Sequence, residues 1–111
     1  MQMRERCFWV YILTNRSQTL YTGMTNNIGA RLAEHRSGKG TAFTAKYKCH
    51  RLVYVERFGY VKDAIAREKQ IKNMHRLDKI KLVVAANPTW KDLSEEWGRR
   101  SFGTGSRVLK W

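Results

Sequence analysis

Residues that commonly hold structural metals are scarce in this chain of 111 residues. It has only two cysteines, Cys7 and Cys49, and neither belongs to a CxxC pair. The three histidines do not fall at zinc-finger spacing, so the common structural zinc sites are excluded. We expect two free thiols, with Cys7 buried because it opens an apolar run.

Long apolar segments are also absent. No run is long enough to cross a bilayer, and the first residues do not resemble a signal peptide. No internal repeat or domain boundary appears along the chain. The 42% of hydrophobic residues is sufficient for a packed core. These features predict one compact cytoplasmic domain, monomeric by default, with no membrane partner.

Acidic residues are few. The chain has 9 Asp and Glu against 22 Lys and Arg, which gives a formal net charge of +13. A basic domain attracts polyanions through long-range steering and the release of condensed counterions. Charge alone does not distinguish DNA from RNA, from acidic lipid or from mere solubility, but it favours nucleic acid as the partner.

Turn-forming residues divide the chain into short β-branched and helical stretches. We predict strands over 7–14, 20–24 and 51–58, helices over 28–36, 62–74 and 77–86, a short helix over 90–97 that packs Trp90 and Trp97, and a basic loop over 38–50. This order indicates an α+β domain over 1–97, with a three-stranded, mainly antiparallel sheet flanked by helices. The basic tail over 98–111 is expected to stay mobile until an anion binds it.

An acidic residue lies on the apolar face of the predicted helix over 62–74. That face consists of Val61, Ala64, Ile65, Ile71 and His75. Glu68 falls on the same face, three residues after Ile65. A carboxylate directed at the core loses hydration unless a cation meets it. Two interpretations stay open, an ion pair with Lys or Arg at the rim of the core, or a ligand for Mg²⁺.

The predicted helix over 28–36 has two further polar residues on a partly apolar face. Arg31 and His35 lie one turn apart, beside Ile28 and Leu32. Arg31 can extend to solvent and His35 can be an ordinary boundary histidine. Together, a permanently charged planar donor and an imidazole can also handle a phosphate group.

Two tyrosines occupy the predicted hairpin. With the turn centred near Arg16, Tyr11 and Tyr21 lie roughly opposite each other on paired strands and on matched faces. Strand tyrosines usually pack in the core, and these two can do the same. Their placement on one face also allows both phenols to point to a common site.

These residues, in this order and spacing, closely resemble the GIY-YIG nuclease family. The matching segments are Val10-Tyr11-Ile12, Tyr21-Thr22-Gly23, Asn27, Arg31, His35, Leu52–Glu56 and Ala66–Asn73. The segment Asn87–Leu93 resembles the ending of a short stand-alone bacterial branch, which is related to the UvrC and Slx1 nuclease domains. The resemblance covers residues 7–97.

The resemblance implies a role for each matched position. Tyr11 and Tyr21 would be the motif tyrosines, Arg31 the catalytic arginine, and Glu68 the ligand of a single Mg²⁺ or Mn²⁺. His35 stands where other members have Tyr or His. Tyr11 is the preferred general base, provided that cationic charge favours its phenolate.

The sequence departs from the family pattern at two places. The GIY motif is Val-Tyr-Ile here, which keeps the tyrosine in frame, and Met24 stands where many relatives have lysine. Gly23, Asn27, Asn73 and Asn87 are candidates for supporting roles.

The remaining basic and aromatic residues are candidates for gripping nucleic acid. These are Lys39, Lys46, Tyr47, Lys48, Arg51 and Lys72, with Phe43 as a further stacking residue. Each basic residue can instead be part of a solvated surface. The expected activity is structure- or strand-selective cutting of DNA, in repair or processing. The alternatives are a nucleic-acid-binding module without catalysis and a nuclease subunit that needs a partner.

Overall fold

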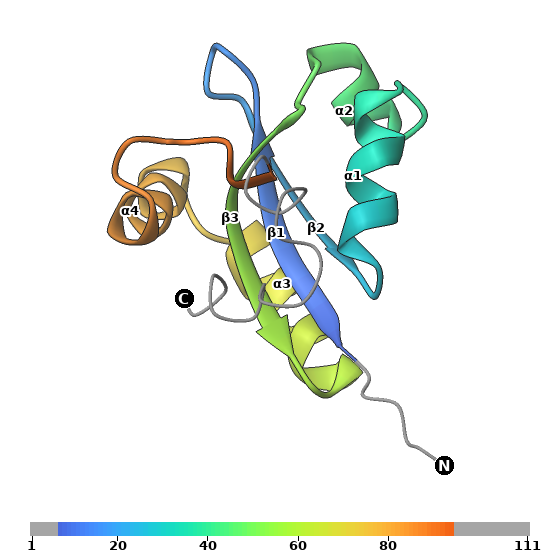
Figure 1. Ribbon diagram of the computed structural model, residues 1–111. Coiled ribbons are helices and arrows are strands. Elements are labelled where there is room, and N and C mark those ends of the chain that lie inside the picture. The colour runs from blue at the N-terminus through green and yellow to red at the C-terminus, as the bar shows by residue number, and fades with distance from the viewer. Residues whose placement is uncertain (1–6, 95–111) are drawn as a thin grey trace.

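The computed structural model describes residues 7–94 as a sheet with helices on both faces (Figure 1). In chain order the elements are β1 (Phe8–Thr14), β2 (Leu20–Thr25), α1 (Ile28–Arg36), α2 (Ala42–Tyr47), β3 (Arg51–Phe58), α3 (Val61–Lys72) and α4 (Arg76–Ala86). Across these residues no helix has both the length and the apolar character needed to span a membrane. The predicted α+β class is confirmed.

The sheet is antiparallel throughout, in the order β2-β1-β3. β1 lies in the centre, where six consecutive residues after Phe8 are buried. A tight turn joins β1 to β2. In this turn the Gln18 N–H donates to the Asn15 carbonyl at 3.0 Å, and the Asn15 side chain accepts from Ser17 N–H at 2.9 Å. The predicted hairpin is therefore confirmed.

Side chains of β1 alternate between two hydrophobic clusters because both faces of the strand are covered. One cluster contains Trp9, Tyr11, Leu13, Ile28, Leu32, Cys49, Leu52 and Val55, and the other contains Val10, Ile12, Val53, Tyr54, Ala64, Ile71 and Val83. α1 thus packs on one face, and α3 and α4 pack on the other (Figure 1). Cys49 is fully buried and Cys7 is only half-buried, so the expectation that Cys7 is the buried thiol was wrong.

Two segments differ from the sequence prediction. The expected loop over 38–50 contains α2, which begins where the Thr41 hydroxyl accepts from Thr44 N–H and ends at Lys48 in a left-handed conformation. Trp90 has a φ of 56° and is not helical, so the expected helix over 90–97 does not begin there. Residues 95–97 and the tail over 98–111 lie outside the described residues.

The inward face of α3 also differs from the prediction. Ala64 and Ile71 are fully buried, whereas Val61 and Ile65 are 44% and 38% exposed. His75 is exposed and precedes α4. The true inward face is rotated toward Ala64, Glu68 and Ile71, which recur at helical spacing. Glu68 is on this face, as predicted, with a side chain that is 20% exposed.

Candidate active site

The two hairpin tyrosines lie side by side on one face of the sheet. Tyr11 is paired with Gly23, and Tyr21 is paired with Leu13, so the tyrosines are diagonal neighbours and not direct opposites. Their ring centroids are 6.3 Å apart. Tyr11 is 1% exposed and Tyr21 is half-buried. The predicted common face is confirmed, and Tyr21 is the more accessible phenol.

Gly23 makes room for the phenol of Tyr11. A Cβ added at this position would lie 2.5 Å from Tyr11 Oη and 2.6 Å from Tyr11 Cζ. Both distances are well inside van der Waals contact, so a larger residue would displace the ring. Gly23 supports the site by letting Tyr11 lie across β2.

His35 links Tyr11 to α2 by two hydrogen bonds. Its Nε2 lies 3.1 Å from Tyr11 Oη, and its Nδ1 lies 2.8 Å from Thr44 Oγ1. The Thr44 hydroxyl donates to the Thr41 carbonyl at 3.2 Å. Thr44 then accepts from His35 Nδ1–H, which leaves Nε2 as the acceptor for the Tyr11 hydroxyl. The result is a buried chain, Tyr11–His35–Thr44.

Gly40 allows His35 to approach the loop before α2. A Cβ at Gly40 would lie 2.3 Å from His35 Nδ1 and 2.9 Å from Thr44 Oγ1. Sequence reasoning missed both Gly40 and Thr44, because residues 38–50 were interpreted as a loop. The available signal was Thr41, which can cap a helix three residues before Thr44.

Burial sets the protonation of the hydrogen-bonded residues Tyr11 and His35. Desolvation lowers the pKa of His35 below its ordinary 6.5, and the charge of Arg31 lowers it further. Desolvation also raises the pKa of Tyr11 well above its ordinary 10, and the neighbouring Tyr21 adds to the rise. Arg31 opposes that rise without reversing it. The charges that the structure describes therefore do not meet the condition set for Tyr11 as a phenolate base, and its role stays a prediction.

Arg31 lies at the open side of the cluster. Its side chain is 40% exposed, and its Nε is 3.6 Å from Glu34 Oε1. Such an exposed pair contributes about 0–1 kcal/mol, so an anion can compete for the guanidinium. Asn27 caps α1 by accepting from Ala30 N–H at 3.1 Å, which fixes the start of the helix that carries Arg31.

Glu68 is paired but not enclosed. Its Oε2 is 3.1 Å from Lys72 Nζ, and the Lys72 side chain is 51% exposed. The charge of Glu68 is also among the causes of the raised pKa of Tyr11, so the carboxylate acts on the phenol electrostatically. The pair with Lys72 matches the first interpretation of Glu68, but its exposure leaves the carboxylate available to another cation.

The donor set around Glu68 suits only some metals. Within residues 7–94 no three His, Cys, Asp or Glu side chains come together to hold an ion. Mg²⁺ and similar ions do not require such a set, because they keep several waters and complete their shell with substrate phosphate. One accessible carboxylate therefore fits Mg²⁺ or Mn²⁺, and it does not fit structural zinc.

A row of aromatic rings leads from Tyr21 to the surface of α2. Phe43 lies 5.9 Å from Tyr21, and Tyr47 lies 4.8 Å from Phe43, between ring centroids. Phe43 and Tyr47 are 39% and 41% exposed. Lys46 Nζ is 5.3 Å from the Tyr47 ring centroid. The row joins the buried chain to a surface that carries positive charge.

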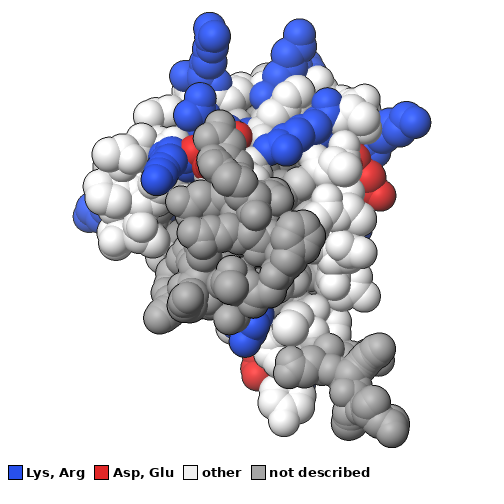
Figure 2. Space-filling model, viewed as in Figure 1, with Lys and Arg blue, Asp and Glu red and all other residues white. Residues whose placement is uncertain are grey.

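Basic side chains gather at the end of the molecule formed by the β1–β2 turn and α2 (Figure 2). The predicted contacts Lys39, Lys46, Lys48 and Arg51 are all exposed.

The two remaining candidate asparagines, Asn73 and Asn87, have structural roles. Asn73 ends α3 and is exposed. Asn87 is buried and donates to the Val53 carbonyl at 3.1 Å, on the opposite face of the sheet from Tyr11.

Comparison with known proteins gives one consistent result. The family model described as the GIY-YIG catalytic domain matches residues 7–81. A UPF0213 protein of Oceanobacillus iheyensis is 41% identical over 75 residues, 68% of this chain and 87% of that protein. A UPF0213 protein of Syntrophus aciditrophicus is 43% identical over 76 residues, with coverage of 68% and 87%. The solution structure of a UPF0213 protein from Bacillus halodurans has a TM-score of 0.53 and 29% identity, and covers 80% of this chain and 95% of that one.

Proposed function

The chain belongs to the GIY-YIG catalytic domain family, and we propose on this basis that it is a DNA endonuclease that uses one divalent metal ion. The observation that carries the proposal is the joint placement of three chemical groups. The buried hydrogen bond between Tyr11 and His35 lies within the electrostatic influence of the half-exposed guanidinium of Arg31, and Tyr11 also feels the carboxylate of Glu68.

In the proposed reaction, Tyr11 and His35 act together as the base. The attacking water gives a proton to Tyr11 Oη while Tyr11 gives its own proton to His35 Nε2, across the 3.1 Å hydrogen bond. The water oxygen bonds to phosphorus, the bond between phosphorus and the 3′ oxygen breaks, and the departing 3′ oxygen takes a proton from solvent. No free phenolate accumulates, which agrees with the raised pKa of Tyr11. The lowered pKa of His35 keeps Nε2 unprotonated and ready to accept.

Arg31 and Glu68 serve the phosphate in this proposal. The planar guanidinium matches two non-bridging oxygens and offsets the charge that grows on them. Glu68 would hold the metal. A bound Mg²⁺ or Mn²⁺ supplies positive charge to the phosphate and to the departing oxygen. Lys72, once parted from Glu68, can contact the DNA backbone. Tyr21 is half-buried beside Tyr11 and can orient the water.

The α2 surface supports a strand- or structure-selective substrate. Exposed Lys39, Lys46 and Lys48 can contact phosphates, while Phe43 and Tyr47 offer flat apolar surface. Aromatic rings stack on unpaired bases with a gain of about 1–3 kcal/mol each, whereas bases inside a duplex are already stacked. We therefore propose DNA with unpaired bases near the cut as the substrate, in repair or processing.

The proposal is tested by cutting assays on labelled single-strand, duplex, flap and RNA substrates in Mg²⁺ or Mn²⁺. Glu68→Gln keeps the shape of the side chain and removes its charge, so we expect at least about a 100-fold loss of rate, or roughly 3 kcal/mol. Asp63→Asn, an equivalent change at an exposed position of the same helix, is the control and should cut normally.

Three results would contradict the proposal. Salt-sensitive binding without any cutting would favour a non-catalytic binding module. Cutting that requires added cell lysate would indicate a subunit that needs a partner. Equal rates for Glu68→Gln and Asp63→Asn would remove Glu68 from the metal site.

A further inference from the structure

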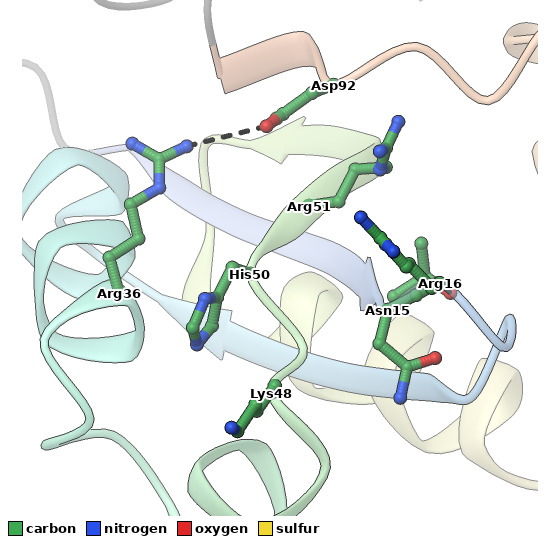
Figure 3. Close-up of a pocket in the computed structure, with 8 residues that line it drawn as sticks. Asn15, Arg16, Arg36, Lys48, His50, Arg51 and Asp92 are labelled. Atoms are coloured by element: carbon green, nitrogen blue, oxygen red, sulfur yellow. Dashed lines mark hydrogen bonds and ion pairs between the residues drawn. The ribbon is translucent and has the colours of Figure 1, made fainter.

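A concave site lies at one end of the sheet, and the hydrogen-bonded residues Tyr11, His35 and Thr44 do not line it. It is an open groove of about 610 Å³, enclosed by the β1–β2 turn, the ends of α1 and α2, and the start of β3 (Figure 3). Charged and ionisable side chains dominate its lining: Arg16, Arg36, Lys48, His50, Arg51 and Asp92. Neither motif tyrosine, nor Arg31, His35 or Glu68, is part of this lining.

Positive charge in the groove exceeds what its own carboxylate can neutralise. Asp92 Oδ2 is 3.7 Å from Arg36 Nη2, and Asp92 Oδ1 already accepts from Leu52 N–H at 3.2 Å. Arg16, Lys48 and Arg51 form no ion pair with any carboxylate that the structure describes. Three cations around one hollow repel each other, and an anion placed between them would remove that repulsion.

Hydrogen bonds hold the walls of the groove in place. Asn15 Nδ2 donates to the Tyr47 carbonyl at 2.7 Å, which ties the hairpin turn to the end of α2. Arg51 donates to the Trp90 carbonyl at 3.3 Å. Lys48 has a φ of 55°, the left-handed conformation that ends α2, so its backbone position is set by the helix. The backbone around the groove is therefore held by the fold, and Arg16 extends from the exposed turn that Asn15 ties to α2.

The groove adjoins the proposed reaction centre. His50 projects into it between Arg36 and Lys48 (Figure 3), and the same His50 is close enough to His35 to lower the pKa of that residue. Tyr47, the last ring of the aromatic row, immediately precedes Lys48. A strand that follows the row past Tyr47 would therefore meet Lys48, which lines the groove.

We propose that this groove binds a backbone phosphate of the substrate strand, near the scissile phosphate and separate from it. The inference rests on the proposed function, and it extends the predicted contacts Lys48 and Arg51 to Arg16, Arg36 and His50. The phosphodiester is the group that is recognised, and DNA and RNA share it. Holding a second phosphate fixes which bond of the strand lies against Tyr11 and Arg31.

The test compares Arg16→Gln/Arg51→Gln with Lys62→Gln/Lys81→Gln, which removes two exposed charges outside the groove. Binding of a labelled DNA strand, and of an RNA strand of the same sequence, is measured by anisotropy from 50 to 300 mM salt, in EDTA to prevent cutting. We expect the groove variant to bind about 10-fold more weakly. The plot of log K against log salt, which has a negative slope, should become shallower by about 1–2. The control should keep the wild-type slope to within about 0.5.

The binding assay separates failure of this inference from failure of the proposed function. Equal losses in the two double variants would overturn the groove, even if the wild type cuts DNA. A selective loss supports the groove, even if no cutting is found. Binding to phosphatidylserine vesicles is measured in the same way. If the groove variant loses affinity for the vesicles but for neither nucleic acid, the inference is also overturned. If the double variant melts at a lower temperature than the wild type, the single variant Arg16→Gln replaces it, because this change affects only the hairpin turn. Its salt dependence of binding is then compared with that of the wild type.

Discussion

Gly40 has no side chain, and this determines where His35 can lie. The Cβ of an alanine would be 2.3 Å from His35 Nδ1, so either the imidazole or the loop must shift. Gly40→Ala should break the hydrogen bond between His35 and Tyr11. We expect a loss of cutting rate of about 10- to 100-fold, measured at saturating substrate, because acid–base catalysis usually contributes that much or more.

Gly59 provides the matched control for this prediction. A Cβ at Gly59 would have open space around it, with nothing within 4 Å. Gly59→Ala should therefore cut at the wild-type rate and melt at or slightly above the wild-type temperature. Similar rates for the two alanine variants would mean that the position of His35 does not matter to the reaction.

The buried imidazole of His35 also makes stability depend on pH. Its pKa is below the 6.5 of the free side chain, so above that pH it is neutral in both folded and unfolded chains. As the pH falls below 6.5, the unfolded chain takes up the proton first, and stability decreases until the folded pKa is passed. Between pH 7 and pH 5, we expect the melting temperature of His35→Gln to fall by less than that of the wild type.

His75 is the natural comparison, because it is exposed in the folded protein. His75→Gln should show the same pH dependence of melting as the wild type. If His35→Gln and His75→Gln lose stability in parallel with the wild type, other groups account for the acid sensitivity.

Among the elements, α3 is held to the sheet by a polar clamp next to Glu68. Arg67 Nε donates to Glu56 Oε1 at 3.0 Å, Arg67 Nη2 donates to Glu56 Oε2 at 3.1 Å, and the Tyr54 hydroxyl donates to the same carboxylate. Both partners of the ion pair are only 20–23% exposed. These contacts fix the rotation of α3 about its own axis. They therefore also fix the direction of Glu68, the residue after Arg67.

Arg67→Met should destabilise the protein by about 1–3 kcal/mol, because it leaves a half-buried carboxylate without its two charged donors. In a domain of this size the melting temperature should fall by several degrees. Lys69→Met removes the same charge from an exposed position of α3 and should melt like the wild type. Equal melting of the two variants would mean that packing alone orients the helix.

How well an element could be predicted depended on its local signals. α1 and β3 have the predicted bounds, because Asn27 and Gly38 mark the ends of the helix and the strand is a run of β-branched and aromatic residues. α2 was missed because only six residues form it and most of them are exposed. The face of α3 was misjudged because Val61 and Ile65 lie at the rim of the core, which periodicity cannot distinguish from its interior.

The same limit applies to the candidate site. Tyr11, Tyr21, Arg31 and Glu68 could be noticed from their placement on strand and helix faces, but only the resemblance to the GIY-YIG family assigned them to one site. The partners of His35 could not be noticed, because Thr44 reaches it only after α2 folds back against α1. Rotation of a helix and closure of a loop depend on contacts between distant segments, and a single sequence does not encode these as a local pattern.

For the molecule as a whole, the metal should matter to the reaction and not to the fold. No three ligand side chains converge anywhere in residues 7–94, and Lys72 already compensates the charge of Glu68. Chelation with EDTA should stop cutting while it changes the free energy of unfolding by less than about 0.5 kcal/mol. Calorimetry with and without Mg²⁺ measures this, and a large loss of stability in EDTA would reveal a structural site.

The position of β2 at the margin of the sheet has a consequence for how a long polymer can approach. Tyr21 and Gly23 lie on this outermost strand, and the described residues place no further strand beyond it. Under the proposed function, a polymer would meet this strand from the side and would not need to thread a free terminus past it. A covalently closed circle would then be as good a substrate as a linear molecule.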